Sequence, residues 1–328
     1  MNERELLVRL LRGPVSGAGL ARTEGQTRAA IWKHVRALRD AGVEIGVLPG
    51  RGYVLDQPMD LLDAETISAG IAEDHRAALV AIEVAWSLDS TNSELLRRVT
   101  SAEGVAALLA ERQSGGRGRR GRAWASPLAA NLYLSVARRF SGGLARLPGL
   151  ALVTGVATVE ALHALGFEGV RLKWPNDLVV ADGAIVRKLG GLLAEGGGEA
   201  GGPARAVIGL GLNVAMPATA AAGIDQPWTD LTKLAAGKAP SRNRVAAAVL
   251  DHWLPALAQF DRDGLAPFLP RYAVLDALAG REVSVSVHGH GATQAGVALG
   301  LADDGALRVR VDGSEQRVHA GEVSVRRA

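Results

Sequence analysis

The chain has 328 residues, more than one ordinary domain needs, so two or three domains are expected. It carries 37 Lys and Arg against 34 Asp and Glu, so anion binding would have to come from local clusters rather than from the net charge of +3. With no cysteine, disulfides and thiolate metal sites are excluded. No apolar run approaches the roughly 20 residues that span a bilayer, and the N-terminus lacks the apolar stretch of a signal peptide. We therefore expect a cytoplasmic protein with no membrane partner.

The first segment, residues 1–58, predicts a winged helix-turn-helix module. Apolar residues at helical spacing indicate helices near 6–11 and, more weakly, near 18–24. A third helix opens after Thr27, a favourable N-cap, and two short strands follow around a Pro-Gly-Arg-Gly turn at 49–52. In this arrangement the third helix enters the major groove of DNA and the hairpin, or wing, touches the backbone.

The third helix carries the basic side chains that DNA binding needs. Ile31, Val35 and Leu38 form its buried stripe, and its cations lie mostly away from that stripe. The candidate DNA contacts are Thr27, Arg28, Trp32, Lys33 and Arg36, together with Arg51 in the turn. Trp32 is either a groove contact or a partner for the wing. A helical packing domain that binds no DNA is the alternative for the whole segment.

Two further domains are expected. Residues 60–278 predict a mixed α/β domain, with strand-like runs that alternate with helices, among them one at 150–165 and one after Ser241. Pro255 inside the latter predicts a kink or a break. In residues 279–328 the apolar period changes to two, with Asp-Gly turn signals, which predicts a small SH3-like β-barrel. The fold class is therefore α+β and multidomain.

The segment Gly-Arg-Gly-Arg-Arg-Gly-Arg at 116–122 indicates an anion-binding loop. Its glycines let backbone amides converge on an anion, and arginine adds bidentate contacts to phosphate or carboxylate. It is not a P-loop, because the Gly-Lys-Ser/Thr ending is absent. An RGG-like RNA contact is possible, although such segments usually lie in long disordered tails. Read alone, the segment is either such a loop or a solvated loop without a function.

Three other stretches point to a site. Residues 173–178, KWPNDL, form a strand-end corner that could hold a phosphate, its metal and an amine, or that is simply a type I turn with a surface ion pair. Lys188 precedes a Gly-Gly pair in an apolar strand, which suggests that it faces a pocket. The small residues of 209–214, GLGLNV, suit a ligand that lies on the sheet.

Two other stretches give weaker signals. Ser90-Thr91-Asn92 follows a strand and precedes a helix, so by chemistry alone it is an N-cap. His288-Gly289-His290 lacks a third ligand, which makes it a poor metal site.

These motifs, in this order and with Trp124 after the arginine loop, resemble the biotin–protein ligase family. The stretches TRAAIWKHVRALRDAGV and PGRGYVL resemble the winged helix of the members that also repress the biotin operon. The resemblance implies a central domain like those of class II synthetases and lipoate ligases. It implies that ATP and biotin form biotinyl-5′-adenylate, and that biotin then passes to one lysine of the biotin carboxyl carrier protein of acetyl-CoA carboxylase. It also implies that the adenylate-loaded protein is a homodimer that binds operator DNA.

The resemblance assigns roles to individual residues. The catalytic residues would be Lys188, Asp177 and Arg119. Biotin would be bound by Ser90, Thr91, Asn92, Gln113, Gly116, Arg117, Gly118, Arg119, Trp124, Lys188, Gly190 and Gly191. ATP or the adenylate would be bound by Arg120, Arg122, Asn131, Lys173, Asn176, Asn213 and Trp228. Mg²⁺ would be held through the phosphates of the nucleotide, with no protein ligand assigned.

Two expectations concern how the site works. Because a lysine with a pKa near 10.4 is almost entirely protonated at neutral pH, a carboxylate must take its proton or hold the ammonium in place, and Asp177 is the candidate. The arginine loop should be mobile until biotin or the adenylate supplies an anionic partner.

Other functions stay open at this point. A lipoate–protein ligase shares the core and the adenylate chemistry. A transcription factor whose central domain only senses a metabolite would bind ligand without turnover of ATP. A ligase whose winged helix has no specific operator is the third alternative.

Overall fold

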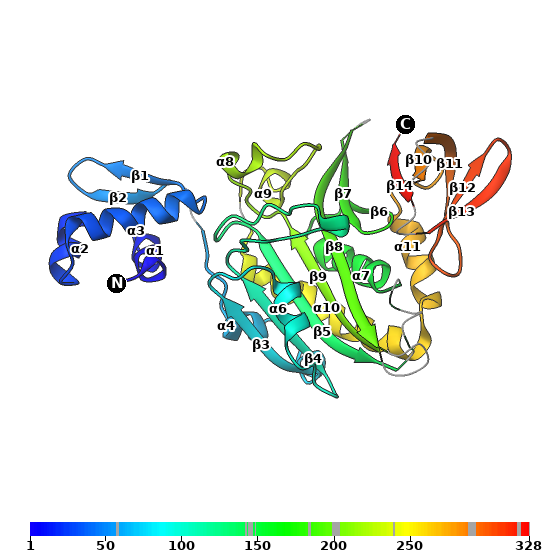
Figure 1. Cartoon of the computed structure of the whole chain (residues 1–328), viewed down its shortest axis with the longest axis horizontal. Helices are drawn as coiled ribbons and strands as arrows, with labels where there is room; N and C mark the ends of the chain where they lie inside the picture. Colours follow the sequence, from blue (N-terminus) through cyan, green and yellow to red (C-terminus); the bar gives the residue numbers. More distant parts are fainter. Residues whose placement is uncertain are drawn as a thin grey trace.

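The structure is a computed structural model that describes residues 1–56, 59–141, 143, 147, 149–182, 185–198, 204–238, 240–287, 293–319 and 323–327. Figure 1 shows the helices and hairpin of the N-terminal segment at one end, a large central sheet, and a small C-terminal sheet at the other end. His288 and His290 lie outside the described residues. Over the part of the chain that the structure describes, no helix is long and apolar enough to cross a membrane.

The N-terminal segment has the order of elements that the sequence predicts. The helices are α1 (Glu3–Leu11), α2 (Gly17–Thr23) and α3 (Arg28–Asp40), and the hairpin joins β1 (Ile45–Leu48) to β2 (Gly52–Leu55). Thr27 caps α3, since its side chain accepts a hydrogen bond of 3.1 Å from the amide of Ala30. Ile31, Val35 and Leu38 are buried, so the predicted apolar stripe is confirmed.

The central sheet has seven strands in the order β3-β4-β5-β9-β8-β7-β6. Only β3 and β4 pair in parallel, and every other neighbouring pair is antiparallel. The strands are β3 (Leu79–Ala85), β4 (Val105–Ala110), β5 (Leu132–Phe140), β6 (Val170–Lys173), β7 (Asp177–Asp182), β8 (Ile185–Gly198) and β9 (Ala204–Leu212). Each predicted strand run of this segment is present, so the mixed α/β architecture is confirmed.

Helices cover both faces of this sheet (Figure 1). The apolar core lies between one face and two helices, α7 (Leu150–Ala164) and α10 (Arg242–Asp263). On the opposite face α6 (Thr91–Arg97) buries Leu95 against β4, β5 and β9. The shorter elements are α4 (Ala64–Ala69), α5 (Glu73–Arg76), the turn η1 (Arg119–Gly121), α8 (Ala218–Ala221), α9 (Leu231–Leu234), η3 (Ala266–Phe268) and α11 (Leu269–Leu275).

Pro255 does not end α10, contrary to the break that the sequence allowed. The helix continues through it to Asp263. Pro255 is exposed, so the carbonyl one turn earlier that loses its amide partner lies near the solvent side, where water can replace the bond.

The C-terminal segment forms a five-stranded antiparallel sheet in the order β13-β12-β11-β10-β14. Its strands are β10 (Glu282–Val287), β11 (Thr293–Leu301), β12 (Leu307–Val311), β13 (Ser314–Val318) and β14 (Val323–Arg327). Asp312 and Gly313 both have positive φ in the turn before β13, as the Asp-Gly signal predicts. The sheet contacts the β6–β7 corner, because the indole of Trp174 donates a hydrogen bond of 3.0 Å to the carbonyl of Gly305.

A buried ion pair ties the chain after the N-terminal segment to the central domain. Arg242 at the start of α10 and Glu111 after β4 are each 2% exposed, and their charged atoms are 2.9 Å apart. Glu111 also accepts the amide of Leu62, and Arg242 contacts Asp60. Since a buried charge is tolerated only when it is paired, this cluster fixes the route by which residues 60–62 enter the central domain.

Replacing Glu111 with alanine is therefore expected to lower the free energy of unfolding by about 3–5 kcal/mol, because buried Arg242 would lose its buried carboxylate and keep only the partly exposed Asp60. The matched control is Glu83→Ala, which removes an exposed pair with Arg98 at 3.0 Å and should cost about 0–1 kcal/mol. Chemical denaturation followed by circular dichroism measures both. Equal small losses in the two variants would contradict the structural role of the buried pair.

Candidate active site

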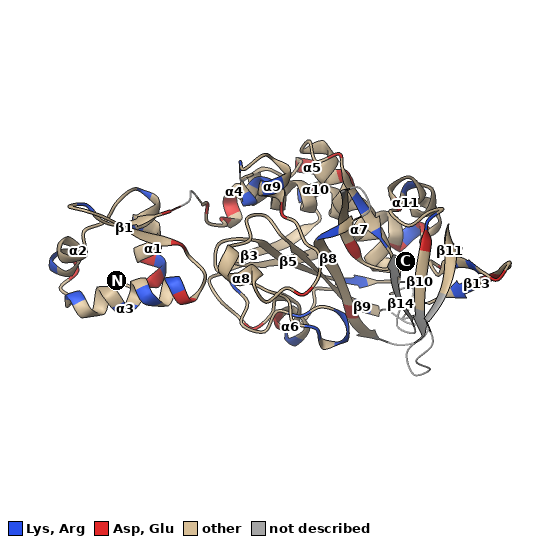
Figure 2. Ribbon diagram, turned by 90° about the horizontal axis from the view of Figure 1, so that it is seen from above, with Lys and Arg blue, Asp and Glu red and all other residues tan. Residues whose placement is uncertain are grey.

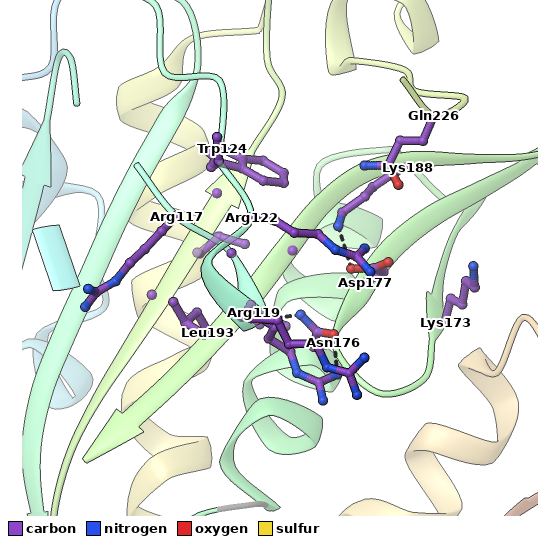
Figure 3. Close-up of a pocket in the computed structure, with 18 of the residues that line it drawn as sticks. Arg117, Arg119, Arg122, Trp124, Lys173, Asn176, Asp177, Lys188, Leu193 and Gln226 are labelled. Carbon is purple, nitrogen blue, oxygen red and sulfur yellow. Dashed lines mark hydrogen bonds and ion pairs between the residues drawn. The ribbon is translucent and has the colours of Figure 1, made fainter. Parts of the chain in front are cut away.

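A cavity of about 760 Å³ opens on the α6 face of the central sheet. Its walls come from the start of α6, the arginine loop, the β6–β7 corner, and strands β8 and β9 (Figure 3). The candidate residues that the structure brings together around it are Ser90, Thr91, Asn92, Gln113, Arg117, Gly118, Arg119, Arg120, Arg122, Trp124, Lys173, Asn176, Asp177, Lys188 and Gly191.

An ion pair between Lys188 and Asp177 lies in the cavity wall. Lys188 Nζ is 2.8 Å from Asp177 Oδ1, and both side chains are about one-fifth exposed. The register between β7 and β8 shifts where Leu178 pairs with Gly190 and Val179 pairs with Lys188, so Leu189 is the extra residue of a β-bulge. Without this bulge Lys188 would lie on the face opposite Gly191, since alternate residues of a strand point to opposite faces. The bulge therefore places the lysine in the cavity beside Asp177.

The arginine loop is folded over the cavity and is held by two contacts to neighbouring residues. Arg117 pairs with Glu195 of β8 at 3.1 Å, and Arg119 donates a hydrogen bond of 3.3 Å to Asn176 Oδ1 (Figure 3). Within the loop, the amide of Gly118 donates to the carbonyl of Arg122, and Arg120 has a positive φ of 59°. The loop thus has a defined conformation here, and whether it orders on ligand binding stays a prediction.

The electrostatics of the cavity favour an anion. Burial lowers the pKa of the Arg119 guanidinium, and repulsion from Arg120 and Arg122 lowers it further, while Asp177 acts in the opposite direction. Arg119 stays charged at neutral pH, because a guanidinium group is not deprotonated in proteins. Its positive charge is therefore held in an unfavourable environment, which a negatively charged ligand would relieve.

The end of the cavity at the start of α6 is polar, and its side chains are hydrogen-bonded to one another. The amide of Thr91 donates to Gln113 Oε1 at 2.8 Å, and Gln113 in turn donates to Ser126 Oγ at 3.1 Å. Asn92 Nδ2 donates to Glu195 at 2.8 Å. Ser90 caps α6, as expected from chemistry alone, and the two residues after it also line the cavity. The N-cap prediction is thus confirmed, and the same stretch lies at the cavity, where its binding of biotin stays a prediction.

Glycines in β9 make room for side chains that line the cavity. A β-carbon at Gly209 would come within 2.3 Å of Asn92 Oδ1, and one at Gly211 within 2.5 Å of the Trp124 ring. The sequence suggests a ligand that lies on the sheet at these glycines, and Gly209 and Gly211 do line the cavity. Asn92 and Trp124 lie directly beside them, so the strand also shapes the cavity through these two neighbours.

Five candidate residues do not line the cavity. Asn131 is fully buried and accepts the amide of Val214, and Asn213 donates to the carbonyl of Thr229. Gly190 is packed between strands, where a β-carbon would lie 2.8 Å from the carbonyl of Gly211. The centre of the Trp228 ring lies 3.3 Å from Lys233 Nζ, and the backbone of Trp228 pairs with that of Lys188. Gly116 lies behind the cavity wall, against Ser126 and Trp124.

Comparison with known proteins assigns the chain to a family. Residues 84–213 match the Biotin/lipoate A/B protein ligase family, 3–54 match the HTH domain, and 279–326 match the Biotin protein ligase C terminal domain. The bifunctional ligase/repressor BirA of Escherichia coli is 41% identical over 313 residues, which cover 95% of this chain and 93% of the relative. The chain belongs to the biotin protein ligase family.

Other relatives agree with this assignment. The biotin–[acetyl-CoA-carboxylase] ligase of Mycobacterium tuberculosis is 34% identical over 74% of this chain and 88% of its own length. Among solved structures, the biotin protein ligase from Aquifex aeolicus in complex with biotin and ATP matches with a TM-score of 0.63 at 27% identity, over 76% of this chain and all of that one.

Sequence reasoning missed two residues of this ligase that hold the site together. Glu195 lies in β8, the same strand as Lys188, and it contacts both Asn92 and Arg117. Ser135 is fully buried in β5, where its hydroxyl lies 2.7 Å from Thr91 Oγ1 and 2.6 Å from Asn92 Oδ1. A serine within the apolar run of β5 was a signal that could have found the second; the pairing of Glu195 depends on tertiary contacts alone.

The candidate DNA contacts lie apart from the cavity, on the N-terminal segment. Figure 2 shows Lys and Arg along α3. Arg28, Lys33, Arg36 and Arg51 are exposed, and so is Trp32. Thr27 has its hydroxyl engaged as the N-cap.

Replacing Gly211 with alanine is expected to displace the Trp124 ring, because the new methyl group would overlap the indole. The free energy of unfolding should fall by about 1–3 kcal/mol, as for other overpacked sites. The nuclear Overhauser contact between the Trp124 indole and the Lys188 side chain, which now lie 5.4 Å apart, should be lost.

The matched control is Gly191→Ala, where the nearest atom would be 3.4 Å from the new methyl group, an ordinary contact. This variant should keep the indole–lysine contact. An unchanged contact in Gly211→Ala would show that Gly211 does not position Trp124.

Proposed function

We propose that this chain joins biotin to a carrier protein at the cavity and represses transcription through its N-terminal module. The proposed ligase activity rests on the cavity, where Lys188, Asp177 and the arginine loop meet on one face of the sheet. Its volume of about 760 Å³ falls within the roughly 300–1,000 Å³ of small-molecule sites. Family membership supplies the substrates, biotin and ATP, which the A. aeolicus relative binds.

The first step joins the biotin carboxylate to the α-phosphorus of ATP. A carboxylate oxygen attacks that phosphorus, the bond to the β-phosphate breaks, and pyrophosphate leaves. The reacting groups are both negative, so fixed cations must offset their repulsion. Lys188 suits this task because the β-bulge holds it in the cavity wall, and Arg119 suits it because its charge is destabilised until an anion arrives.

We place biotin toward the polar end and the nucleotide toward the β6–β7 corner. The ureido group of biotin is neutral and needs donors and acceptors, which Ser90, Thr91, Asn92 and Gln113 provide. Trp124 and Gly191 form the channel for the biotin chain. Arg120, Arg122, Lys173 and Asn176 would meet the phosphates and the nucleotide.

The remaining candidates would act from behind the cavity. Asn131 and Asn213 hold the backbone around Val214 and Thr229, and Gly190 permits close strand packing. Trp228 is held beside Lys188 by backbone pairing, so its loop can cover the adenylate.

Magnesium would enter with the nucleotide. The described residues contain no cluster of three or more His, Asp or Glu side chains that could hold a metal ion by themselves. Of the acidic groups nearby, Asp177 and Glu195 already pair with cations. This donor set fits an ion held mainly by phosphate oxygens, where it would supply further positive charge.

In the second step the amine of the acceptor lysine attacks the acyl carbon and AMP leaves. The amine must first lose its proton, and Asp177 is placed at the cavity wall to accept it. One of its oxygens is occupied by Lys188, so the other is the proposed proton acceptor.

We also propose a carrier protein, a homodimer and a role for each domain. The acceptor is the biotin carboxyl carrier protein of acetyl-CoA carboxylase. Residues 1–58 bind operator DNA as part of a homodimer that forms when the adenylate is bound. Residues 60–278 carry the ligase chemistry, and residues 279–328 form the third domain.

The test of the ligase function offers two substrates to the same enzyme. The full-length protein is incubated with ATP, Mg²⁺ and a carrier domain, and with either labelled biotin or labelled lipoate. We expect acid-stable label on the carrier with biotin alone. Label from lipoate instead would assign the other branch of the family, and ligand binding without any transfer would leave a metabolite sensor.

Asp177→Asn is expected to slow transfer to the carrier by roughly 100-fold, within the usual range for loss of a general base. Formation of the adenylate should change much less, because the amide oxygen of the new side chain can still accept a hydrogen bond from Lys188. Single-turnover experiments with and without the carrier separate the two steps.

Asp225→Asn is the control, because Asp225 also lines the cavity but its substitution leaves the Lys188–Asp177 pair in place. This variant should keep the wild-type ratio of the two rates. Equal slowing of both steps in Asp177→Asn would mean that Asp177 only positions Lys188.

A further inference from the structure

One large apolar side chain stands exposed in the middle of the basic face of α3. Trp32 is 50% exposed. Arg28 lies four residues before it and Arg36 four residues after it, so the three side chains form one row along the helix. All three are exposed, whereas the stripe at Ile31, Val35 and Leu38 faces the core.

Trp32 and Arg36 also contact each other. The guanidinium carbon of Arg36 lies 5.6 Å from the centre of the Trp32 ring, within the range of a cation–π contact. The other partner of Arg36 is Asp40, at 3.8 Å, in a pair of which both members are about two-thirds or more exposed. Such a pair is worth little in water, so it would not prevent the guanidinium from turning to another acceptor.

The charges around Trp32 favour nucleic acid over protein as its partner. Arg28 and Lys33 flank it on the helix, Arg51 lies in the turn of the wing, and Asp40 at the far end is the only acid within α3. An exposed tryptophan is also a common anchor of protein interfaces. A surface so rich in cations is instead complementary to the phosphates on either side of a DNA groove.

We propose that Trp32 and Arg36 form a reading pair that sets the operator sequence, with Trp32 packed on the methyl group of a thymine and Arg36 bonded to a nearby guanine. In the major groove the thymine methyl is the apolar feature of a base edge, and arginine pairs bidentately with guanine O6 and N7. Residues four apart on a helix rise about 6 Å, close to two base-pair steps of about 3.4 Å each. The thymine and the guanine should therefore lie about two positions apart.

The inference deepens the proposed repressor function and rests on it. The first experiment selects bound sequences from a random duplex library, using the full-length protein with biotin and ATP. The selected site is then remade with deoxyuridine at one thymine at a time, which removes only the methyl group. We expect one such position in each half-site to weaken wild-type binding roughly tenfold, near the low end of the cost of changing one base pair of a specific site.

Variants assign this effect to Trp32. With Trp32→Ala, thymine and deoxyuridine at that position should bind equally well, and Trp32→Phe should restore part of the difference. Lys33→Ala, expected to lose only a phosphate contact, should weaken all sequences alike and keep the difference. Biotin transfer to the carrier domain should be unchanged in all three, since these exposed side chains lie outside the cavity.

The possible results distinguish the Trp32–Arg36 reading pair from the repressor function on which it rests. Specific binding that is insensitive to every deoxyuridine, or a sensitivity that survives in Trp32→Ala, overturns the inference and leaves the repressor function standing. A loss of dimer mass in Trp32→Ala with unchanged DNA binding also overturns it, because Trp32 would then be a protein contact. An active ligase that selects no sequence at all removes the repressor function and the inference with it.

Discussion

The site depends on the ion pair between Lys188 and Asp177. A lysine in a cavity that already holds several arginines is repelled by them, and Asp177 at 2.8 Å offsets that repulsion. The β-bulge at Leu189 makes the pair possible by turning Lys188 onto the face of Asp177. The corner that bears Asp177 is in turn held by Trp174, whose indole is bonded to the C-terminal sheet. A contact between two domains thus supports the central charge pair.

The cavity is also connected to the N-terminal module through one segment of chain. The arginine loop continues through Trp124 to Leu128, whose amide donates a hydrogen bond of 2.9 Å to the carbonyl of Ala41 at the end of α3. Leu128 and Ala129 belong to the apolar core of that module. The segment that follows the arginine loop therefore packs against the end of the helix that carries Trp32.

Part of the fold and of the site could be predicted from the sequence, and part could not. Apolar periodicity located the strands and helices, because one face of each element must be buried. The arginine loop, Lys188 and Asp177 stood out by their chemistry. The structural role of Asn131 could not be recognised in the sequence. An asparagine that is hydrogen-bonded to a buried backbone amide has the same local pattern as one that binds a nucleotide. Glu195 and the bulge at Leu189 depend on pairing between distant strands, which no short stretch of sequence encodes.

If the cavity forms an acyl-adenylate, the protein should exchange labelled pyrophosphate into ATP in the absence of any carrier protein. We expect exchange that requires biotin, is lost in Lys188→Met, and persists in Trp32→Ala. Exchange that is independent of biotin, or that survives without Lys188, would contradict the assignment of the adenylation step to this site.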